Sequence, residues 1–231
     1  AAPLALGGVH VWTTIALGAT ATCLGALAVA VHWDRAPRFG LVGLGLAIWV
    51  LVTVLQAIPL PFGLVEAIAP HTAQRYADAA ATLGQDVGWI PLSLAPAETS
   101  LAVWTLMGAL GLYLVGSLHM RRRETFDWIV PRLAAVGFVF LVICVVQTGL
   151  FGELVLGVYR PSTPLRGALV TTFVNPNHAS AFFGAFAPIS LGIALGARDP
   201  GQRNGFVALY LMMSLAMFLT FSRAAILSWA L

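Results

Sequence analysis

Polar residues gather in the stretch 171–178, Thr-Thr-Phe-Val-Asn-Pro-Asn-His, immediately before a long apolar segment. Asn177 is expected to be the N-cap of the helix that follows, and Asn175-Pro176 favours a turn. This capping role alone would explain both asparagines. The functional alternative is an anion-binding site, because two amides and the His178 imidazole would meet the N–H groups and the dipole of a helix N-terminus.

A second polar cluster, Thr-Phe-Ser-Arg at 220–223, ends another apolar segment. Arg223 stands between two apolar segments with almost no loop. An ionisable group at such a boundary is a candidate functional residue, although an arginine there can also extend towards lipid head groups. Arg160 and Arg166, in the loop that leads to Asn175, would add two positive charges at the same face. Together with Arg223 they predict a site for an anion.

The amino-acid composition indicates what kind of structure must position these residues. Hydrophobic residues make up 59% of the 231-residue chain, charged residues 9%, and the mean hydropathy is +0.90. In typical soluble proteins roughly 45–50% of residues are hydrophobic and about 25% are charged. The long apolar blocks exclude a soluble globule and also a transmembrane barrel, whose strands alternate. Cys23 and Cys144 each lie within an apolar block and are interpreted as small hydrophobic residues.

Windows of about twenty apolar residues predict an all-α fold, a polytopic transmembrane helical bundle that forms one domain over residues 1–231. Six complete spans are expected, with the start of a seventh at about Ala224. The six are His10–Val31, Phe39–Leu60, Leu101–Leu118, Trp128–Leu150, Ala179–Ala197 and Gly205–Phe221. The chain starts without Met and stops within an apolar run, so we expect a fragment of a longer protein.

The basic residues indicate the orientation of the bundle. All twelve are arginines, and they lie between the apolar segments, so the formal net charge of +3 does not indicate nucleic-acid binding. Eight fall in alternate loops, which are expected to be cytoplasmic because basic residues are enriched on that side. These eight are Arg35, Arg38, Arg121, Arg122, Arg123, Arg132, Arg198 and Arg203. The outer loops are then 61–100 and 151–178.

The outer loop 61–100 contains two pieces of helical composition, 64–69 and 72–83, separated by Pro70. Gly84 is placed to end the second piece. Apolar residues on one side predict an amphipathic helix lying on the outer membrane surface. A short helix that caps the bundle is the alternative.

Small residues in the fifth span predict close helix packing. Gly192 and Gly196 form a G-x-x-x-G pair, and Ser180 with Gly184 forms a similar step. Such pairs let helix backbones approach one another, either inside the bundle or at an oligomer contact. Pro188 is expected to kink this helix.

Four stretches in order resemble a known family. They are Gln-Ala-Ile-Pro-Leu-Pro at 56–61, Pro-Leu-Ser-Leu-Ala-Pro at 91–96, Thr-Phe-Val-Asn-Pro-Asn-His at 172–178 and Thr-Phe-Ser-Arg at 220–223. With these motifs the chain resembles the O-antigen ligase and polymerase-like superfamily of bacterial envelope glycosyltransferases. The resemblance extends from about Pro3 onward. The last two motifs together are the most specific part of it.

The resemblance implies a multi-pass protein of the bacterial inner membrane that acts on an undecaprenyl-diphosphate-linked glycan at the periplasmic side. It implies no metal and no cofactor. Arg223 matches the family's membrane-boundary arginine and would hold a phosphate of the leaving diphosphate. Arg166 and Arg160 would assist it. The substrate-binding set would be completed by Asn175, Asn177 and His178, with His178 a loop histidine and not a general base.

Further family residues, an arginine and a histidine, would lie in a large periplasmic loop after Leu231. The expected partners are membrane lipids and the lipid-linked glycan. A second hypothesis is a non-enzymatic transmembrane subunit of a larger membrane complex derived from this family. A transporter is disfavoured, because all nine acidic residues lie in or beside loops. The sequence leaves ligase and polymerase activity open.

Overall fold

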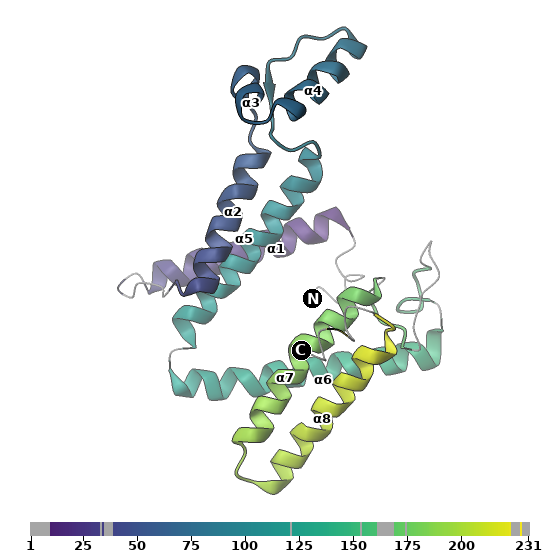
Figure 1. Ribbon diagram of the computed structural model, residues 1–231. Coiled ribbons are helices and arrows are strands. Elements are labelled where there is room, and N and C mark those ends of the chain that lie inside the picture. Colours follow the sequence, from purple (N-terminus) through teal and green to yellow (C-terminus); the bar gives the residue numbers. More distant parts are fainter. Residues whose placement is uncertain are drawn as a thin grey trace. The chain divides into compact units, whose positions relative to one another are not determined.

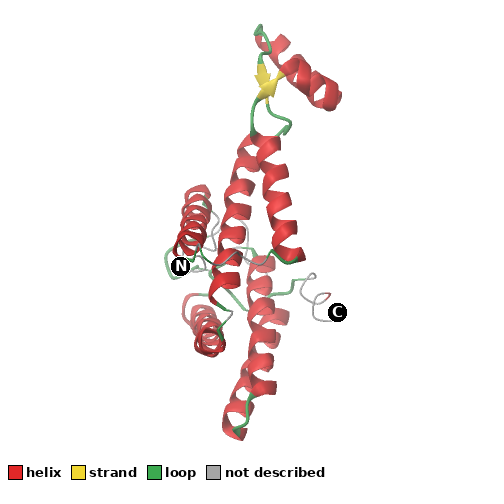
Figure 2. Ribbon diagram, turned by 90° about the vertical axis from the view of Figure 1, so that its left-hand side faces the viewer, coloured by secondary structure: helices red, strands yellow, loops and turns green. Residues whose placement is uncertain are grey.

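The computed structural model describes residues 10–32, 34, 39–120, 122–152, 154–160, 169–173, 175–222 and 227. The chain divides into two compact units, one formed by residues 14–119 and the other by residues 1–13 and 120–231. Helices account for nearly all of the regular structure in the described residues (Figure 2). The predicted all-α class is therefore confirmed.

The first unit, 14–119, contains three long helices. They are α1 (Val11–Val31), α2 (Leu41–Ala57) and α5 (Pro96–His119). Helices α2 and α5 lie side by side (Figure 1). Gly43 of α2 faces the ring of Tyr113 on α5, and the Tyr113 hydroxyl accepts a hydrogen bond from the Gly40 N–H at 3.2 Å.

Helices α1 and α5 cross where both carry glycine. A Cβ atom built on Gly25 would lie 2.5 Å from the Cα of Gly111, and one built on Gly111 would lie 2.8 Å from the carbonyl carbon of Ala21. A Cβ on Gly18 would similarly lie 2.8 Å from the carbonyl carbon of Trp104. The obstructing atoms are backbone atoms, which cannot turn aside. The crossing therefore requires glycine on both helices.

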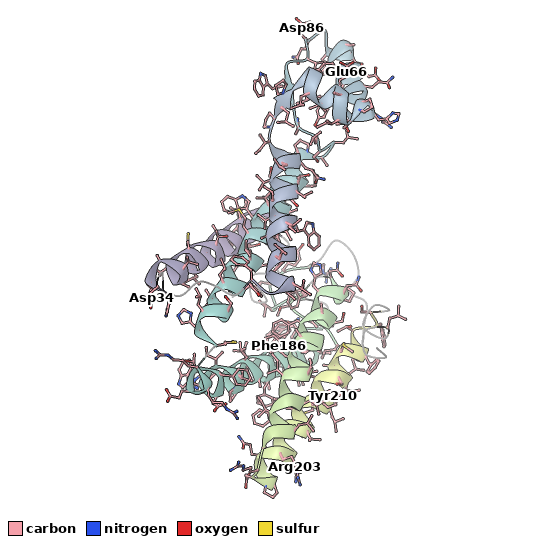
Figure 3. The ribbon with its side chains drawn as sticks, turned by 60° about the vertical axis from the view of Figure 1, so that its left-hand side comes forward. Asp34, Glu66, Asp86, Phe186, Arg203 and Tyr210 are labelled. Atoms are coloured by element: carbon pink, nitrogen blue, oxygen red, sulfur yellow. The ribbon has the colours of Figure 1, made fainter. Side chains whose placement is uncertain are left out.

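Between α2 and α5 the chain forms a small structure with its own core. Its helices are α3 (Phe62–Ile68) and α4 (Pro70–Leu83), and strand β1 (Leu60–Pro61) pairs antiparallel with β2 (Trp89–Ile90). Glu66 and Asp86, labelled in Figure 3, lie on this structure.

The ends of α4 follow the sequence signals. Pro70 occupies its first turn, where a missing N–H costs nothing. Gly84 adopts φ 64° and donates its N–H back to the helix, so it ends α4 as predicted. Val65, Ala73 and Ile90 form the buried core, and the Tyr76 hydroxyl donates to the Ser93 carbonyl at 2.8 Å. The two helices expected in 61–100 are both present.

The second unit contains α6 (Arg123–Phe151), α7 (Pro176–Gly196) and α8 (Pro200–Leu219). Helices α7 and α8 form an antiparallel hairpin (Figure 1). The Asp199 side chain caps α8 by accepting from the Gln202 N–H at 2.6 Å. Phe183 and Met213 are fully buried in a core that also takes in residues of α6. Arg203 marks the far end of the hairpin (Figure 3).

Four of the described helices, α1, α5, α6 and α7, are long and apolar enough to cross a membrane. Helix α2 is apolar but has only 17 residues, and α8 begins with the polar residues Gln202, Arg203 and Asn204. Large apolar side chains are exposed on these helices; Leu41, at the start of α2, is 90% exposed. Such surfaces are stable in lipid and not in water. The chain is a membrane protein.

The small residues of α7 differ in how closely other atoms approach them. No described atom lies within 4 Å of a Cβ built on Gly192 or Gly196, so close packing at this pair stays a prediction. Ser180, by contrast, is buried, and a Cβ on Gly184 would lie 3.3 Å from the Met217 sulfur of α8. The close approach in α7 is therefore at its first half, beside the candidate site.

Candidate functional site

Asn175 is the residue that caps α7. Its backbone is extended, with φ −93° and ψ 116°, and its Oδ1 accepts a hydrogen bond from the Asn177 N–H at 2.9 Å. Pro176 occupies the first helical position, which suits its fixed φ and its missing N–H. The prediction that Asn177 is the cap is wrong by two residues, because the proline already specifies where the helix begins.

The capping also changes how an anion would be bound. The Asn177 N–H is taken by the Asn175 side chain, and the His178 N–H donates to the Asn175 carbonyl at 3.1 Å. Free backbone N–H groups were the expected ligands, but these two already have partners. Helix α7 therefore contributes the field of its dipole, and direct hydrogen bonds to an anion fall to side chains.

Asn177 connects the two polar clusters of the sequence. Its Oδ1 accepts a hydrogen bond of 2.7 Å from the hydroxyl of Ser222. Ser222 is 2% exposed and follows the end of α8, whereas Asn177 lies in the first turn of α7. This bond joins the stretch 171–178 to the stretch 220–223 across 45 residues of chain. One described residue of each stretch is therefore in contact with the other stretch.

The side-chain oxygens of both asparagines thus accept hydrogen bonds. The Asn175 Oδ1 accepts from the Asn177 N–H, and the Asn177 Oδ1 accepts from the Ser222 hydroxyl. A carboxamide oriented by its oxygen presents its Nδ2 group, which can only donate. Asn175 and Asn177 are both exposed. The start of α7 therefore carries two oriented amide donors, and donors are the groups that bind an anion.

A turn after α8 brings Ser222 back towards α7. Thr220 ends the helix, and its hydroxyl donates to the Met217 carbonyl at 2.7 Å. Phe221 then adopts φ 55°, a left-handed conformation that is unfavourable for a bulky residue. Backbone strain of this kind persists only where surrounding contacts enforce it. Here the enforcing contacts include the Ser222 hydrogen bond.

The segment between α6 and α7 is held by polar side chains of α6 and by the end of α8. The Thr148 hydroxyl accepts from the Val170 N–H at 2.9 Å, and the Leu169 N–H donates to the Leu219 carbonyl at 3.2 Å. Gln147, 1% exposed, accepts from the Leu156 N–H at 2.6 Å and donates to the Leu154 carbonyl. The C-terminal ends of α6 and α8 are therefore tied to the loop that leads into α7.

Aromatic rings form the apolar side of the site. The Phe173 ring meets the His178 imidazole edge to face at 6.5 Å between centroids, and meets Phe140 in the same way at 5.5 Å. The His178 side chain is exposed. The imidazole thus lies at the rim of an aromatic cluster and not in a buried catalytic position.

The predicted charged residues are only partly placed. Arg160 is exposed and follows the Val155–Tyr159 bridge. Arg166 and Arg223 lie outside the described residues, so their roles stay predictions. In the part of the chain that the structure describes, no cluster of three His, Cys, Asp or Glu side chains could hold a metal ion.

Several residues of the site were not singled out from the sequence. In the sequence Ser222 is only one member of a motif, and Gln147 and Thr148 lie within an apolar span. A polar side chain near the C-terminal end of a span is the signal that could identify Gln147 and Thr148. Thr172 is fully buried, and its hydroxyl has no hydrogen-bond partner among the described residues.

Comparison with known proteins adds no assignment: no protein-family model, curated protein or solved structure matches this chain. Functional inference therefore depends on the geometry of the site and on the motifs.

Proposed function

We propose that this chain belongs to a bacterial inner-membrane glycan ligase or polymerase-like protein. It transfers a polysaccharide from undecaprenyl diphosphate to an acceptor on the periplasmic side. The observation that carries the proposal is the hydrogen bond between Ser222 and Asn177. It brings the two motifs of the family resemblance to one place, although they lie far apart in the sequence.

The chemistry of the site fits a diphosphate leaving group. When an acceptor hydroxyl attacks the anomeric carbon, the bond from that carbon to the diphosphate oxygen breaks and negative charge develops on the departing phosphate. The amide donors of Asn175 and Asn177 and the dipole of α7 stabilise negative charge. Arg223, one residue after Ser222, supplies a bidentate guanidinium, with Arg160 and Arg166 as further cations.

The proposal includes a membrane topology for the helices. Helices α2 and α8 cross the membrane together with α1, α5, α6 and α7, which makes six spans. The arginine-rich loops are cytoplasmic, and the start of α7 and the end of α8 face the periplasm. Helix α4 lies on the outer membrane surface as an amphipathic element. A lipid-linked glycan then reaches the site from the membrane with its diphosphate at the lipid boundary.

A transfer assay tests this function. Membranes containing the protein are supplied with lipid-linked oligosaccharide, and released undecaprenyl diphosphate is measured by mass spectrometry. Arg223→Lys keeps the charge and loses the planar fork, so release should fall far more than protein level. Arg160→Ala should lower the release of undecaprenyl diphosphate by a smaller factor. Arg203→Ala, at the opposite end of α8, is the matched control and should leave release unchanged.

Normal release by an Arg223→Ala protein at normal abundance would remove Arg223 from the reaction. Absence of release from the unaltered protein, in membranes that contain its natural partners, would favour the non-enzymatic subunit.

A further inference from the structure

Two histidines meet in the first unit, whereas the residues of the candidate site belong to the second. His32 directly follows α1, and His119 is the last residue of α5. Their rings are 4.7 Å apart between centroids and inclined by 73°. Both side chains are partly buried. They come from helices whose crossing is itself fixed by the glycine contacts of Gly25 and Gly111.

The hydrogen bonds of the two rings define their free nitrogens. The Nδ1 of His32 lies 3.1 Å from the Ala28 carbonyl, and the Nδ1 of His119 lies 3.0 Å from the Val115 carbonyl. A carbonyl oxygen only accepts, so each Nδ1 carries a proton and, in the neutral imidazole, each Nε2 keeps its lone pair. Backbone carbonyls orient metal-binding histidines in this way.

The electrostatic field at this place favours a cation. Helices α1 and α5 both end here, and the C-terminal end of a helix carries partial negative charge and unpaired carbonyl groups. The same field disfavours a phosphate group, which is the other ligand that paired histidines commonly bind. The histidine pair is thus better suited to a metal ion than to a lipid head group.

We propose that His32 and His119 bind one divalent transition-metal ion, such as zinc, through their Nε2 atoms. Two imidazoles bound to a single ion at about 2.0–2.1 Å bring their ring centroids about 5 Å apart, close to the observed spacing. Imidazole ligands suit zinc, copper and nickel, whereas magnesium and calcium require oxygen ligands.

Water completes the coordination. In the described residues no third His, Cys, Asp or Glu joins the pair in a metal-binding cluster. A cavity of about 280 Å³ borders His119 and is lined mainly by apolar residues such as Leu27, Val31 and Leu112, so the ion itself, and not the cavity wall, would hold these water ligands. The ion links the ends of α1 and α5 and so stabilises their crossing, a role independent of glycan transfer.

Metal binding by the purified protein in detergent tests the proposal. Zinc is titrated in competition with a coloured indicator, and one equivalent of Cu²⁺ is examined by electron paramagnetic resonance. One zinc ion per chain and a copper spectrum with two coupled nitrogens are expected. His32→Ala and His119→Ala should each weaken zinc binding by about tenfold or more. His71→Ala, an exposed histidine on α4, is the matched control and should change nothing.

A wild-type copper spectrum without two nitrogen ligands would overturn the proposal, and this measurement does not depend on any variant folding. Zinc affinity that is the same in the wild type, His32→Ala and His119→Ala would overturn it as well. Saturating zinc should also raise the unfolding temperature of the wild type and of His71→Ala, but not that of the double variant lacking both ligands.

Discussion

Gly111→Ala tests the closest helix contact in the first unit. A Cβ at residue 111 would lie 2.8 Å from the carbonyl carbon of Ala21 and 3.0 Å from the Cα of Thr22. Both obstructing atoms belong to the backbone of α1, so the helices must separate. Inserting a methyl group into a packed contact costs about 1–3 kcal/mol. Alanine has a helix propensity better than that of glycine by about 0.8–1.0 kcal/mol, so we expect a net loss of up to about 2 kcal/mol in the free energy of unfolding.

Gly116→Ala is the matched control on the same helix. No described atom lies within 4 Å of a Cβ at residue 116, so this change should leave the free energy of unfolding unchanged or raise it by up to about 1 kcal/mol. Both variants are measured by reversible unfolding in mixed micelles with increasing sodium dodecyl sulfate. If Gly111→Ala proves at least as stable as Gly116→Ala, the described crossing of α1 and α5 is wrong.

The site, the segment 61–93 and the membrane orientation each allow one further test. Asn177→Ala and Ser222→Ala should show a coupling energy of about 1 kcal/mol in a double-mutant cycle of unfolding, as a single hydrogen bond does; additive effects would contradict that bond. Burial raises the pKa of Tyr76 above its ordinary value of 10.0, so the protonated phenol stabilises the fold below pH 10 and this contribution is lost as pH rises above it. Proteolysis of the 61–93 segment should therefore accelerate above pH 10 in the wild type, and Tyr76→Phe should be more susceptible at neutral pH. A cysteine at Asp78 should react with an impermeant reagent outside intact cells, whereas one at Arg203 should react only after the cells are opened; the reverse pattern would overturn the orientation.

The long helices were predictable because lipid imposes a simple rule on sequence. A segment that crosses a bilayer needs about twenty apolar residues, and the windows around α1, α5, α6 and α7 satisfy it. Local signals also predicted that Pro70 separates the two helices of this segment and that Gly84 ends α4. These features depend on neighbouring residues alone, so the sequence contains the information directly.

Contacts between distant segments were harder to predict. A G-x-x-x-G pair shows that a backbone can be approached, but not which helix approaches it. The motif therefore indicates Gly192 and Gly196, whereas the tight crossing uses Gly25 and Gly111. The short pairing of β1 with β2 was missed for the same reason, because two residues in each strand carry no periodic pattern.

The candidate site contains both local features that the sequence predicts and contacts between distant segments that it does not. The two polar stretches were recognisable because polar residues at the ends of apolar spans are rare. The assignment of the N-cap failed because Asn175 and Asn177 are equally good caps, and only Pro176 distinguishes them. The bond from Ser222 to Asn177 needs the hairpin of α7 and α8 and the left-handed turn at Phe221, neither of which a motif specifies.

Binding of undecaprenyl diphosphate to the wild type and to Asn175→Asp tests the central claim most directly. Aspartate is as good an N-cap as asparagine and suits the helix dipole, so the variant should unfold at the same temperature. It replaces an amide donor with a negative charge at the proposed phosphate site. Binding is measured by native mass spectrometry. The wild type should form a complex, and the variant should bind at least about tenfold more weakly, a difference of about 1.4 kcal/mol in binding free energy. Equal affinity, or no complex with the wild type, would contradict it.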